Sequence, residues 1–246
     1  MSKILKYSVL IIGLGNIGMR YDYDNYSEEI ILTHAKSFYI NDNFNLIGGV
    51  DLKEKNLNEF KKKYKCNGFS DIKEAMINLY PDIVIISSPT NKHFENIKEV
   101  FKYHNPKIII CEKPLSYEIN ESKKILELCK SNNAKLFINY FRRTLPGNLK
   151  ILSLINSKEI RTPFHGTCIY SKGLFNSSSH FINLFQFLFG EVKNIKLINK
   201  NINKSLSDPE PDFELEFDEG KIIFIANKNT NIFLNSSEIV MQNGKL

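Results

Sequence analysis

Short apolar runs alternate with amphipathic segments over residues 1–140 of the chain. The runs contain few polar residues, which is typical of strands that are buried on both faces of a sheet. We predict strands at 9–12, 44–51, 81–86, 107–111 and 135–140, and helices that open at Asn16 and span 33–38, 52–64, 72–79, 94–103 and 119–130. Because strands and helices alternate in this way, the sequence predicts an α/β fold with a parallel, doubly wound sheet.

The pattern changes after the segment 141–147, where the regular alternation of strand and helix stops. Helices are predicted at 149–157 and 178–189, and mostly alternating strands at 164–170, 192–199, 213–217, 221–226 and 232–241. The segment 218–220 is typical of a hairpin turn, and 201–211 of a flexible loop. The sequence therefore predicts two domains, 1–141 and 142–246, the second being α+β with an antiparallel or mixed sheet.

Three glycines follow the first predicted strand in the spacing Gly13-x-Gly15-x-x-Gly18. In a dinucleotide-binding turn, the first glycine allows the tight turn, the second lets the backbone approach a diphosphate, and the third permits close packing of helix on strand. The helix that opens at Asn16 and Ile17 would present free N–H groups to that anion. Glycine clusters also occur in ordinary turns, so a purely structural turn is the alternative. The strand before it and the helix after it favour the dinucleotide site.

Asp51 ends the second predicted strand. An acidic residue at this position accepts hydrogen bonds from ribose hydroxyls and repels a 2′-phosphate, so Asp51 favours NAD over NADP. The usual interval from the glycines is about 20 residues, and a polar, tyrosine-rich insertion at 21–32 accounts for the longer interval here. The alternative is an aspartate that only caps the helix predicted at 52–64.

The composition is that of an ordinary globular protein: 246 residues, 42% hydrophobic, with a net charge of +6. The lysine cluster at 61–65 is interpreted as the solvated end of a helix, because no recognition motif accompanies it, and we expect no nucleic-acid partner. The four cysteines lack metal-ligand spacing, which predicts reduced thiols and no metal site. The apolar runs are too short for a signal peptide or a membrane span, so we expect a cytoplasmic protein with no membrane partner.

Polar residues follow the predicted strands at their carboxyl ends, where ligands bind to parallel sheets. Five motifs share this placement or follow it along the chain: the glycine turn, Ser88-Pro89-Thr90-x-x-His93, Glu112-Lys113-Pro114, Asn139-Tyr140-x-Arg142-Arg143, and a His180-x-x-Asn183 helix that ends at Gly190. In this order and spacing the chain resembles the Gfo/Idh/MocA family of NAD(P)-dependent oxidoreductases. The resemblance implies a Rossmann domain, an open-sheet domain that contacts substrate, and hydride transfer at a hydroxyl-bearing carbon of a sugar or related polyol.

The resemblance also implies roles for individual residues. Lys113 and His180 would exchange the proton of the reacting hydroxyl, as a desolvated lysine and a histidine can do near neutral pH. The alternatives are a surface lysine at a strand end and a core histidine on an apolar helix. The residues implied to bind NAD are Gly13, Gly15, Asn16, Ile17, Gly18, Asp51, Ser88, Pro89, Thr90, His93, Glu112 and Asn139, although His93 is equally typical of a helix N-terminus. Arg143, Lys172 and Asn183 are implied to contact the substrate, although exposed salt bridging accounts equally well for Arg143 and Lys172.

Asn176 departs from the family, in which many members carry an aspartate four residues before the histidine. An asparagine can hydrogen-bond a hydroxyl but cannot accept its proton. The segment 172–180 resembles a branch associated with surface-sugar biosynthesis, which favours a nucleotide sugar or amino sugar as substrate. The alternative, motivated by Asn176, is a catalytically silent NAD-binding sensor or assembly protein.

Family members usually continue for some tens of residues beyond the equivalent of Gly244, so the chain resembles a member that lacks its C-terminal edge. Open sheet edges invite pairing with another chain. We therefore expect a homo-oligomer, while the substrate and the direction of the reaction stay open.

Overall fold

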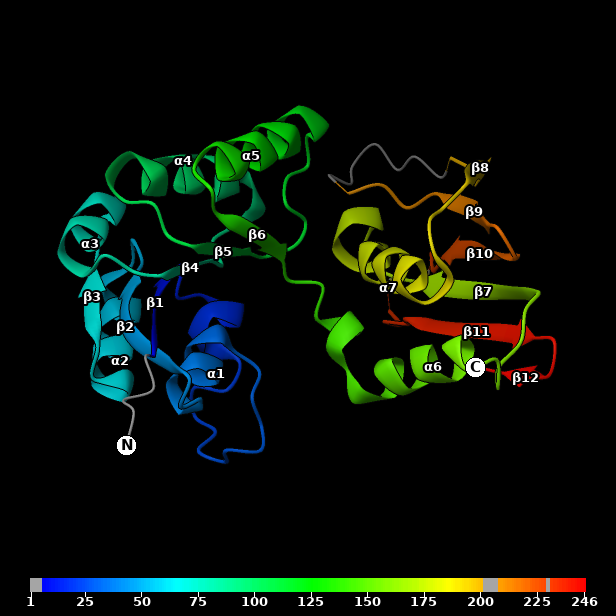
Figure 1. The fold of residues 1–246 in the computed structure, drawn as a ribbon, viewed down its shortest axis with the longest axis horizontal. Helices are drawn as coiled ribbons and strands as arrows, with labels where there is room; N and C mark the ends of the chain where they lie inside the picture. Colours follow the sequence, from blue (N-terminus) through cyan, green and yellow to red (C-terminus); the bar gives the residue numbers. More distant parts are fainter. Residues whose placement is uncertain (1–5, 201–207, 229–230) are drawn as a thin grey trace. The chain divides into compact units, whose positions relative to one another are not determined.

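The computed structural model describes residues 6–200, 208–228 and 231–246. The chain forms two compact units, Met1–Asn139 and Tyr140–Leu246 (Figure 1). Each unit has a sheet of its own. No helix in the described ranges combines the length and the hydropathy that crossing a membrane requires.

The first unit contains a six-stranded parallel sheet. Its strands are β1 (Tyr7–Ile12), β2 (Phe44–Val50), β3 (Asn67–Phe69), β4 (Ile83–Ile86), β5 (Ile108–Cys111) and β6 (Lys135–Ile138). They lie in the order β3-β2-β1-β4-β5-β6, which confirms the predicted parallel, doubly wound sheet. Because the chain winds outward in both directions from β1, a crevice opens at the carboxyl ends of β1 and β4, where such sheets bind ligands.

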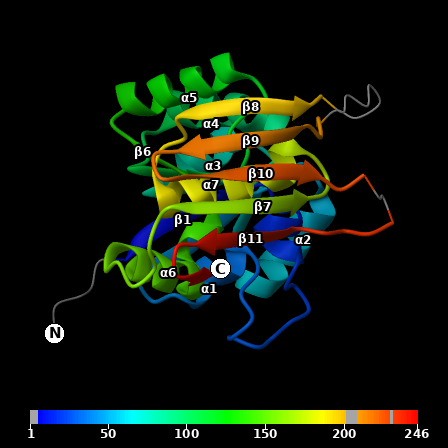
Figure 2. The same ribbon diagram turned by 90° about the vertical axis from the view of Figure 1, so that its right-hand side faces the viewer.

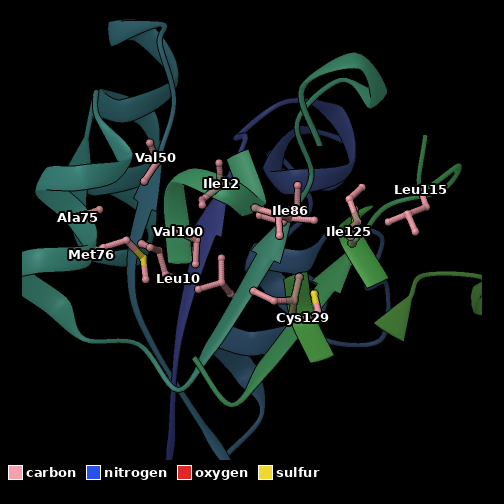
Figure 3. Packing of buried hydrophobic residues seen from close by; sticks show 14 residues of the cluster. Leu10, Ile12, Val50, Ala75, Met76, Ile86, Val100, Leu115, Ile125 and Cys129 are labelled. Atoms are coloured by element: carbon pink, nitrogen blue, oxygen red, sulfur yellow. The ribbon is translucent and has the colours of Figure 1, made fainter. Parts of the chain in front are cut away.

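Helices cover both faces of this sheet, and each face has a hydrophobic core. The helical segments are η1 (Asn16–Arg20), α1 (His34–Ile40), α2 (Glu54–Tyr64), α3 (Ile72–Leu79), η2 (Thr90–Lys92), α4 (His93–Tyr103) and α5 (Ile119–Ser131). Met76, Val100 and Ile125 bring α3, α4 and α5 onto one face, where they meet Leu10 and Ile86 (Figure 3). Residues of η1, α1 and α2 form the core on the other face. The glycine turn is thus held between two packed layers.

Two local predictions for this unit differ from the structure. The edge strand β3 was not predicted, because Asn67–Phe69 is a three-residue segment with a polar start and a glycine. The helix predicted from Asn16 is a single five-residue π-helical turn that ends at Arg20. The insertion at 21–32 follows it, and the helical pattern resumes at α1.

The insertion at 21–32 is anchored by two buried charged side chains. The Lys36 ammonium donates hydrogen bonds to three backbone carbonyls of the insertion, at 2.6 to 3.0 Å. The Asp22 carboxylate accepts from the backbone N–H and the hydroxyl of Thr33, which caps α1. Both side chains are at most 5% exposed. Since all these groups are paired, the insertion fixes the start of α1 and the residue that follows the cap, His34.

Asp82 links three strands at the opposite, amino-terminal edge of the sheet. Its Oδ2 accepts from the N–H and the hydroxyl of Ser8, and its Oδ1 from Lys107 Nζ at 2.7 Å. Burial acts to raise the pKa of Asp82, but the hydrogen bonds from Lys107 and Ser8 outweigh it and lower this pKa to about 2. The ionised carboxylate therefore stabilises the folded state.

We expect Asp82→Asn to lower the free energy of unfolding at pH 7 by about 1 kcal/mol, a value discounted for the solvent-exposed lysine. Because the pKa of Asp82 is lower in the folded chain, this stabilisation is present above about pH 4 and is lost as the pH falls towards about 2. Urea unfolding between pH 7 and pH 2.5 measures the difference. Asp42→Asn, which removes a fully exposed carboxylate paired with Lys6, is the control. Equal losses in both variants, or a difference that does not change with pH, would contradict the assignment.

The second unit contains a six-stranded mixed sheet beside two α-helices. Its elements are η3 (Phe141–Thr144), α6 (Pro146–Asn156), β7 (Phe164–Tyr170), η4 (Leu174–Ser178), α7 (Ser179–Phe189), β8 (Asn194–Asn199), β9 (Asp212–Phe217), β10 (Gly220–Ala226), β11 (Ser236–Met241) and β12 (Gly244–Lys245). The strand order is β12-β11-β7-β10-β9-β8, with β7 and β10 parallel and the other pairs antiparallel (Figure 2). The predicted α+β unit with a mixed sheet is confirmed.

The hairpin predicted at 218–220 is also present, since Phe217 pairs with Gly220 across β9 and β10. The strand predicted at 232–241 is shorter, because only Ser236–Met241 pairs with β7. Of the loop predicted at 201–211, residues 201–207 lie outside the described residues.

The apolar helix α7 covers one face of this sheet. Its residues Phe181 and Phe185, one turn apart, are at most 5% exposed and pack on strands β9 and β10. Phe213 and Phe224 of these strands stack with ring centroids 4.5 Å apart. This aromatic core fixes the rotation of α7 and so determines which of its residues face away from the sheet.

Candidate active site

The first unit has a cavity of about 480 Å³ at the carboxyl ends of β1, β2 and β4. Five of the residues predicted to bind the cofactor line it: Gly13, Gly15, Asp51, Ser88 and Pro89. Asn16, Ile17, Gly18, Thr90, His93, Glu112 and Asn139 are not among its lining residues. A larger hollow, at the opposite edge of the sheet, is lined by Tyr7 and Lys107 and contains none of the predicted site residues. The cavity at the carboxyl ends is therefore the candidate ligand site.

The three glycines of the turn have different surroundings. A Cβ on Gly13, whose φ is +100°, would lie 2.6 Å from the Ser88 nitrogen, and one on Gly18 would lie 2.1 Å from the Gly13 carbonyl oxygen. A Cβ on Gly15 would meet no atom within 4 Å. The fold itself thus requires Gly13 and Gly18, whereas Gly15 leaves open space at the cavity. This arrangement fits a dinucleotide, whose diphosphate needs close approach to the backbone at the second glycine.

Asp51 lies at the end of β2 with its carboxylate held by three N–H donors. Oδ2 accepts from the backbone of Leu14 at 2.8 Å and from Asn56 Nδ2 at 2.9 Å, and Oδ1 accepts from the backbone of Lys53 at 2.8 Å. The N-cap of α2 is Lys53, so the alternative that Asp51 caps this helix is wrong. A carboxylate has about four acceptor positions, so a ligand hydroxyl can still bind to it.

Ser87 and His93 support the loop after β4. The Ser87 hydroxyl donates to the Gly13 carbonyl at 2.7 Å and so ties this loop to the glycine turn. His93 is fully buried, with Nδ1 3.1 Å from the Leu115 carbonyl oxygen and Nε2 2.9 Å from that of Ser88. The imidazole therefore supports Ser88 from inside the protein, and His93 is also the first residue of α4.

A second group of polar side chains lies at the ends of β5 and β6. Glu112 Oε1 accepts from Asn139 Nδ2 at 2.7 Å and lies 2.8 Å from His34 Nε2, at the start of α1. Burial acts to raise the pKa of Glu112, but the hydrogen bonds from His34 and Asn139 outweigh it, and the pKa lies below its ordinary value. This cluster immobilises the residue that precedes Lys113. Sequence reasoning missed His34, because its contact with Glu112 spans 78 residues and leaves no local signal.

In the second unit, two aromatic rings contact the imidazole of His180 on α7. The rings of Tyr140 and Phe141 meet its imidazole edge-on, with centroids 5.8 and 5.4 Å away. Burial raises the pKa of the Tyr140 phenol. Arg143 Nε donates to Asn183 Oδ1 at 2.5 Å. Three residues predicted to act on the substrate, His180, Arg143 and Asn183, therefore come together where η3 meets α7.

The other two predicted residues are Lys172, in the turn that leads into η4, and Asn176, within η4. Asp208, which sequence reasoning missed, accepts the backbone N–H of Phe175 at 2.9 Å and that of Asn176 at 2.8 Å. Gly173, with φ of +92°, makes room for this carboxylate, since a Cβ there would lie 2.2 Å from Asp208. The Lys172 ammonium lies 4.5 Å from the centre of the Phe233 ring. A carboxylate thus lies at the backbone of Asn176, the position at which the sequence departs from the family.

Several curated proteins are similar in sequence to parts of the chain. The chain is 25% identical over 211 residues to a protein named Oxidoreductase P35 from Formosa agariphila. This match covers 76% of this chain and 61% of that protein. The chain is 29% identical over 134 residues to myo-inositol 2-dehydrogenase from Thermotoga maritima, covering 54% of this chain and 36% of the relative. The match to oxidoreductase YrbE of Bacillus subtilis covers only 27% of that protein, so the chain spans less than two thirds of the length of these relatives.

Solved structures share the fold over nearly the whole chain. Scyllo-inositol dehydrogenase from Lactobacillus casei, solved with NAD(H) and scyllo-inositol, matches 98% of this chain and 76% of its own, with a TM-score of 0.75 and 17% identity. An oxidoreductase from Agrobacterium radiobacter, solved with NAD⁺, L-tartaric acid and magnesium, matches 96% of this chain and 72% of its own, with a TM-score of 0.76 and 14% identity. At these identities the likeness concerns the fold alone.

The model of one protein family, described as an oxidoreductase family with an NAD-binding Rossmann fold, matches residues 7–140, more than half of the chain. This range contains the parallel sheet, the glycine turn and Asp51, and it confirms the resemblance noted from the motifs. The chain belongs to the Gfo/Idh/MocA family of oxidoreductases, and residues 7–140 form its NAD-binding Rossmann fold.

Proposed function

We propose that this protein is an NAD-dependent oxidoreductase that acts on a hydroxyl-bearing carbon of a sugar or nucleotide sugar. The observation that carries the proposal is the glycine turn, where Gly15 alone leaves open space beside a cavity that also contains Asp51. In this proposal the unit Met1–Asn139 binds the cofactor and the unit Tyr140–Leu246 contacts the substrate. Bound NAD supplies the acceptor or donor of a hydride.

The proposed roles of the chain's residues follow from their surroundings. The backbone at Gly13 and Gly15 receives the diphosphate, and Asp51 accepts the ribose hydroxyls. Ser88 and Pro89 line the same cavity. Glu112 and Asn139, which bond each other, hold the end of β5 in place and so position Lys113.

Lys113 and His180 are proposed to hold and move the proton of the reacting hydroxyl. Lys113 follows Glu112, whose carboxylate is held by His34 and Asn139, and two aromatic rings contact the imidazole of His180 within the second unit. An imidazole and a desolvated primary amine are both suited to general acid–base catalysis near neutral pH. Asn176 would orient the substrate by hydrogen bonding.

The substrate class is proposed from the cationic and amide groups of the second unit. Arg143 is held by Asn183, and a guanidinium in a fixed position is suited to bind phosphate or carboxylate. Lys172 supplies a second cation on the same unit. Two of the proteins that the chain resembles are named as inositol dehydrogenases, which supports a polyol or sugar. A screen of inositols, free sugars and nucleotide sugars for NAD-dependent turnover separates these classes.

The cofactor site is tested by titrating the purified protein with NADH and NADPH and following the fluorescence of the nicotinamide. We expect micromolar binding of NADH, weaker binding of NADPH, and a loss of about tenfold or more in NADH affinity in Asp51→Ala, because a charged acceptor of ribose hydroxyls is removed. Asp42→Ala, which removes an exposed carboxylate outside the cavity, is the control. If neither dinucleotide binds to the wild-type protein, the proposed function is wrong.

Asn176 supports a second candidate, a silent NAD-binding sensor or assembly protein, because an amide cannot accept a proton. This candidate predicts cofactor binding without turnover on any sugar or nucleotide sugar. Turnover that appears or increases in Asn176→Asp would instead show that the site is built for catalysis.

A further inference from the structure

Arg20, at the end of η1, is connected to the cofactor-selecting carboxylate through one side chain. Its Nη2 donates to Asn56 Oδ1 at 2.6 Å and to Glu59 Oε2 at 2.7 Å. Asn56 Nδ2 in turn donates to Asp51 Oδ2 at 2.9 Å. Glu59, Arg20, Asn56 and Asp51 therefore form an unbroken chain of hydrogen bonds from α2 to the end of β2.

The orientation of Asn56 within this chain is determined by its neighbours. The guanidinium offers only donors, so it must face the amide oxygen, and the Asp51 carboxylate offers only acceptors, so it must face the amide nitrogen. Asn56 is 5% exposed and lines the cavity. Both hydrogens of Arg20 Nη2 are used, one on Asn56 and one on Glu59. Asn56 thus holds Asp51 and Arg20 apart while it bonds to both.

The separation of Arg20 from Asp51 by the Asn56 side chain bears on the choice between NAD and NADP. In Rossmann folds an acidic residue at the end of the second strand selects NAD, whereas a nearby arginine accommodates the 2′-phosphate of NADP. This chain has both residues, but the charge of Arg20 is compensated by Glu59, and the two side chains are only 33% and 25% exposed. Lys55, 3.9 Å from the other Glu59 oxygen, is largely exposed and competes weakly for this carboxylate.

We infer that Glu59 and Asn56 determine cofactor specificity by keeping Arg20 away from the ribose-binding carboxylate. The inference rests on the proposed function, because it assumes that a dinucleotide occupies this cavity. Glu59 acts only through Arg20, and Asn56 both restrains Arg20 and orients Asp51. When this restraint is removed, the guanidinium can offset the charge of Asp51 and bind a 2′-phosphate with charge-assisted hydrogen bonds.

Lys53 and Lys92 line the cavity, whereas Arg20 lies behind Asn56, and both lysines would also attract a 2′-phosphate. Both lysines are present in the wild-type protein and in each variant. Their contribution therefore cancels when the ratio of the NADPH and NADH dissociation constants of a variant is compared with that of the wild-type protein. This ratio is therefore the quantity that reports on Arg20.

The test is a fluorescence titration of Glu59→Ala with NADH and with NADPH. We expect the NADPH dissociation constant to fall by about tenfold, the effect of a few charge-assisted hydrogen bonds, while that of NADH changes by less than about twofold. Adding Arg20→Gln to Glu59→Ala is expected to abolish the gain. Glu127→Ala, which removes an exposed carboxylate on α5, is the matched control for net charge and should leave the ratio unchanged.

Two further variants keep the test informative if Glu59→Ala does not fold. Glu59→Gln preserves the shape and a hydrogen-bond acceptor and should shift the ratio in the same direction by a smaller factor. Asn56→Leu removes the donor to Asp51, so NADH binding should weaken by about tenfold with a smaller loss for NADPH. An unchanged ratio in every folded variant, with NADH binding intact, would overturn the inference and leave the proposed function standing. Failure of the wild-type protein to bind either dinucleotide would overturn both.

Discussion

Replacing Gly15 with valine is expected to abolish NADH binding and leave the fold intact. A Cβ at this position meets no protein atom within 4 Å, and the backbone is extended with a negative φ of −75°. The added side chain therefore costs the folded protein little, but it occupies the space in which a diphosphate must approach the backbone. We expect the affinity for NADH to fall by at least about 100-fold, or 2.7 kcal/mol, with a change of no more than a few degrees in the midpoint of thermal unfolding.

Two further glycine variants show that the effect belongs to this position. Gly147→Val is the matched control, because a Cβ there also meets nothing within 4 Å but lies in α6, outside the cavity. It should leave NADH binding unchanged. Gly18→Val should instead destabilise the protein, since its Cβ would lie 2.1 Å from the Gly13 carbonyl oxygen. Retention of wild-type NADH affinity in Gly15→Val would place the cofactor elsewhere and contradict the proposed site.

Replacing Lys113 with methionine is expected to lower kcat by about 10²- to 10⁴-fold on the polyol or nucleotide sugar that the screen identifies, because a group that moves the hydroxyl proton is lost. Methionine retains much of the apolar length of the side chain, so NADH binding should change by less than about threefold. Steady-state kinetics and the fluorescence titration measure the two effects separately. His180→Gln should show the same pattern.

Lys123→Met provides the control for Lys113→Met, because Lys123 is an exposed lysine on α5. Its kcat should equal that of the wild-type protein. Full activity in Lys113→Met would remove Lys113 from the mechanism, and full activity in His180→Gln would do the same for His180. Equal losses of kcat and of NADH affinity in Lys113→Met would indicate a cofactor-binding role in place of proton transfer.

The parallel sheet could be predicted because its strands carry their signal locally. Val9, Ile11 and Ile85 are fully buried, and runs of such residues between amphipathic segments specify strands that helices cover on both sides. The same holds for α3 and β2, whose observed bounds agree with the predicted pattern to within a residue. The edge strand β3 could not be predicted, because its three residues become a strand only by pairing with β2.

The supports of the candidate site depend on residues that are distant in sequence. Glu112 meets His34 across 78 residues, Glu59 meets Arg20 across 39, and Asp208 meets Asn176 across 32. Each pair forms only after strands and helices have packed, so no local pattern contains it. The burial of His93 also depends on a partner distant in sequence, since its Nδ1 lies near the carbonyl oxygen of Leu115, 22 residues away.

By itself, the sequence determined the family, the two kinds of sheet, and the glycine turn with Asp51, because these depend on residue type at short, fixed spacings. The tertiary structure alone decided which glycine faces open space, which predicted residues line the cavity, and that Arg20 is paired with Glu59 close to Asp51. Those features depend on distances between side chains of different elements, and packing sets these distances only when the whole unit has folded.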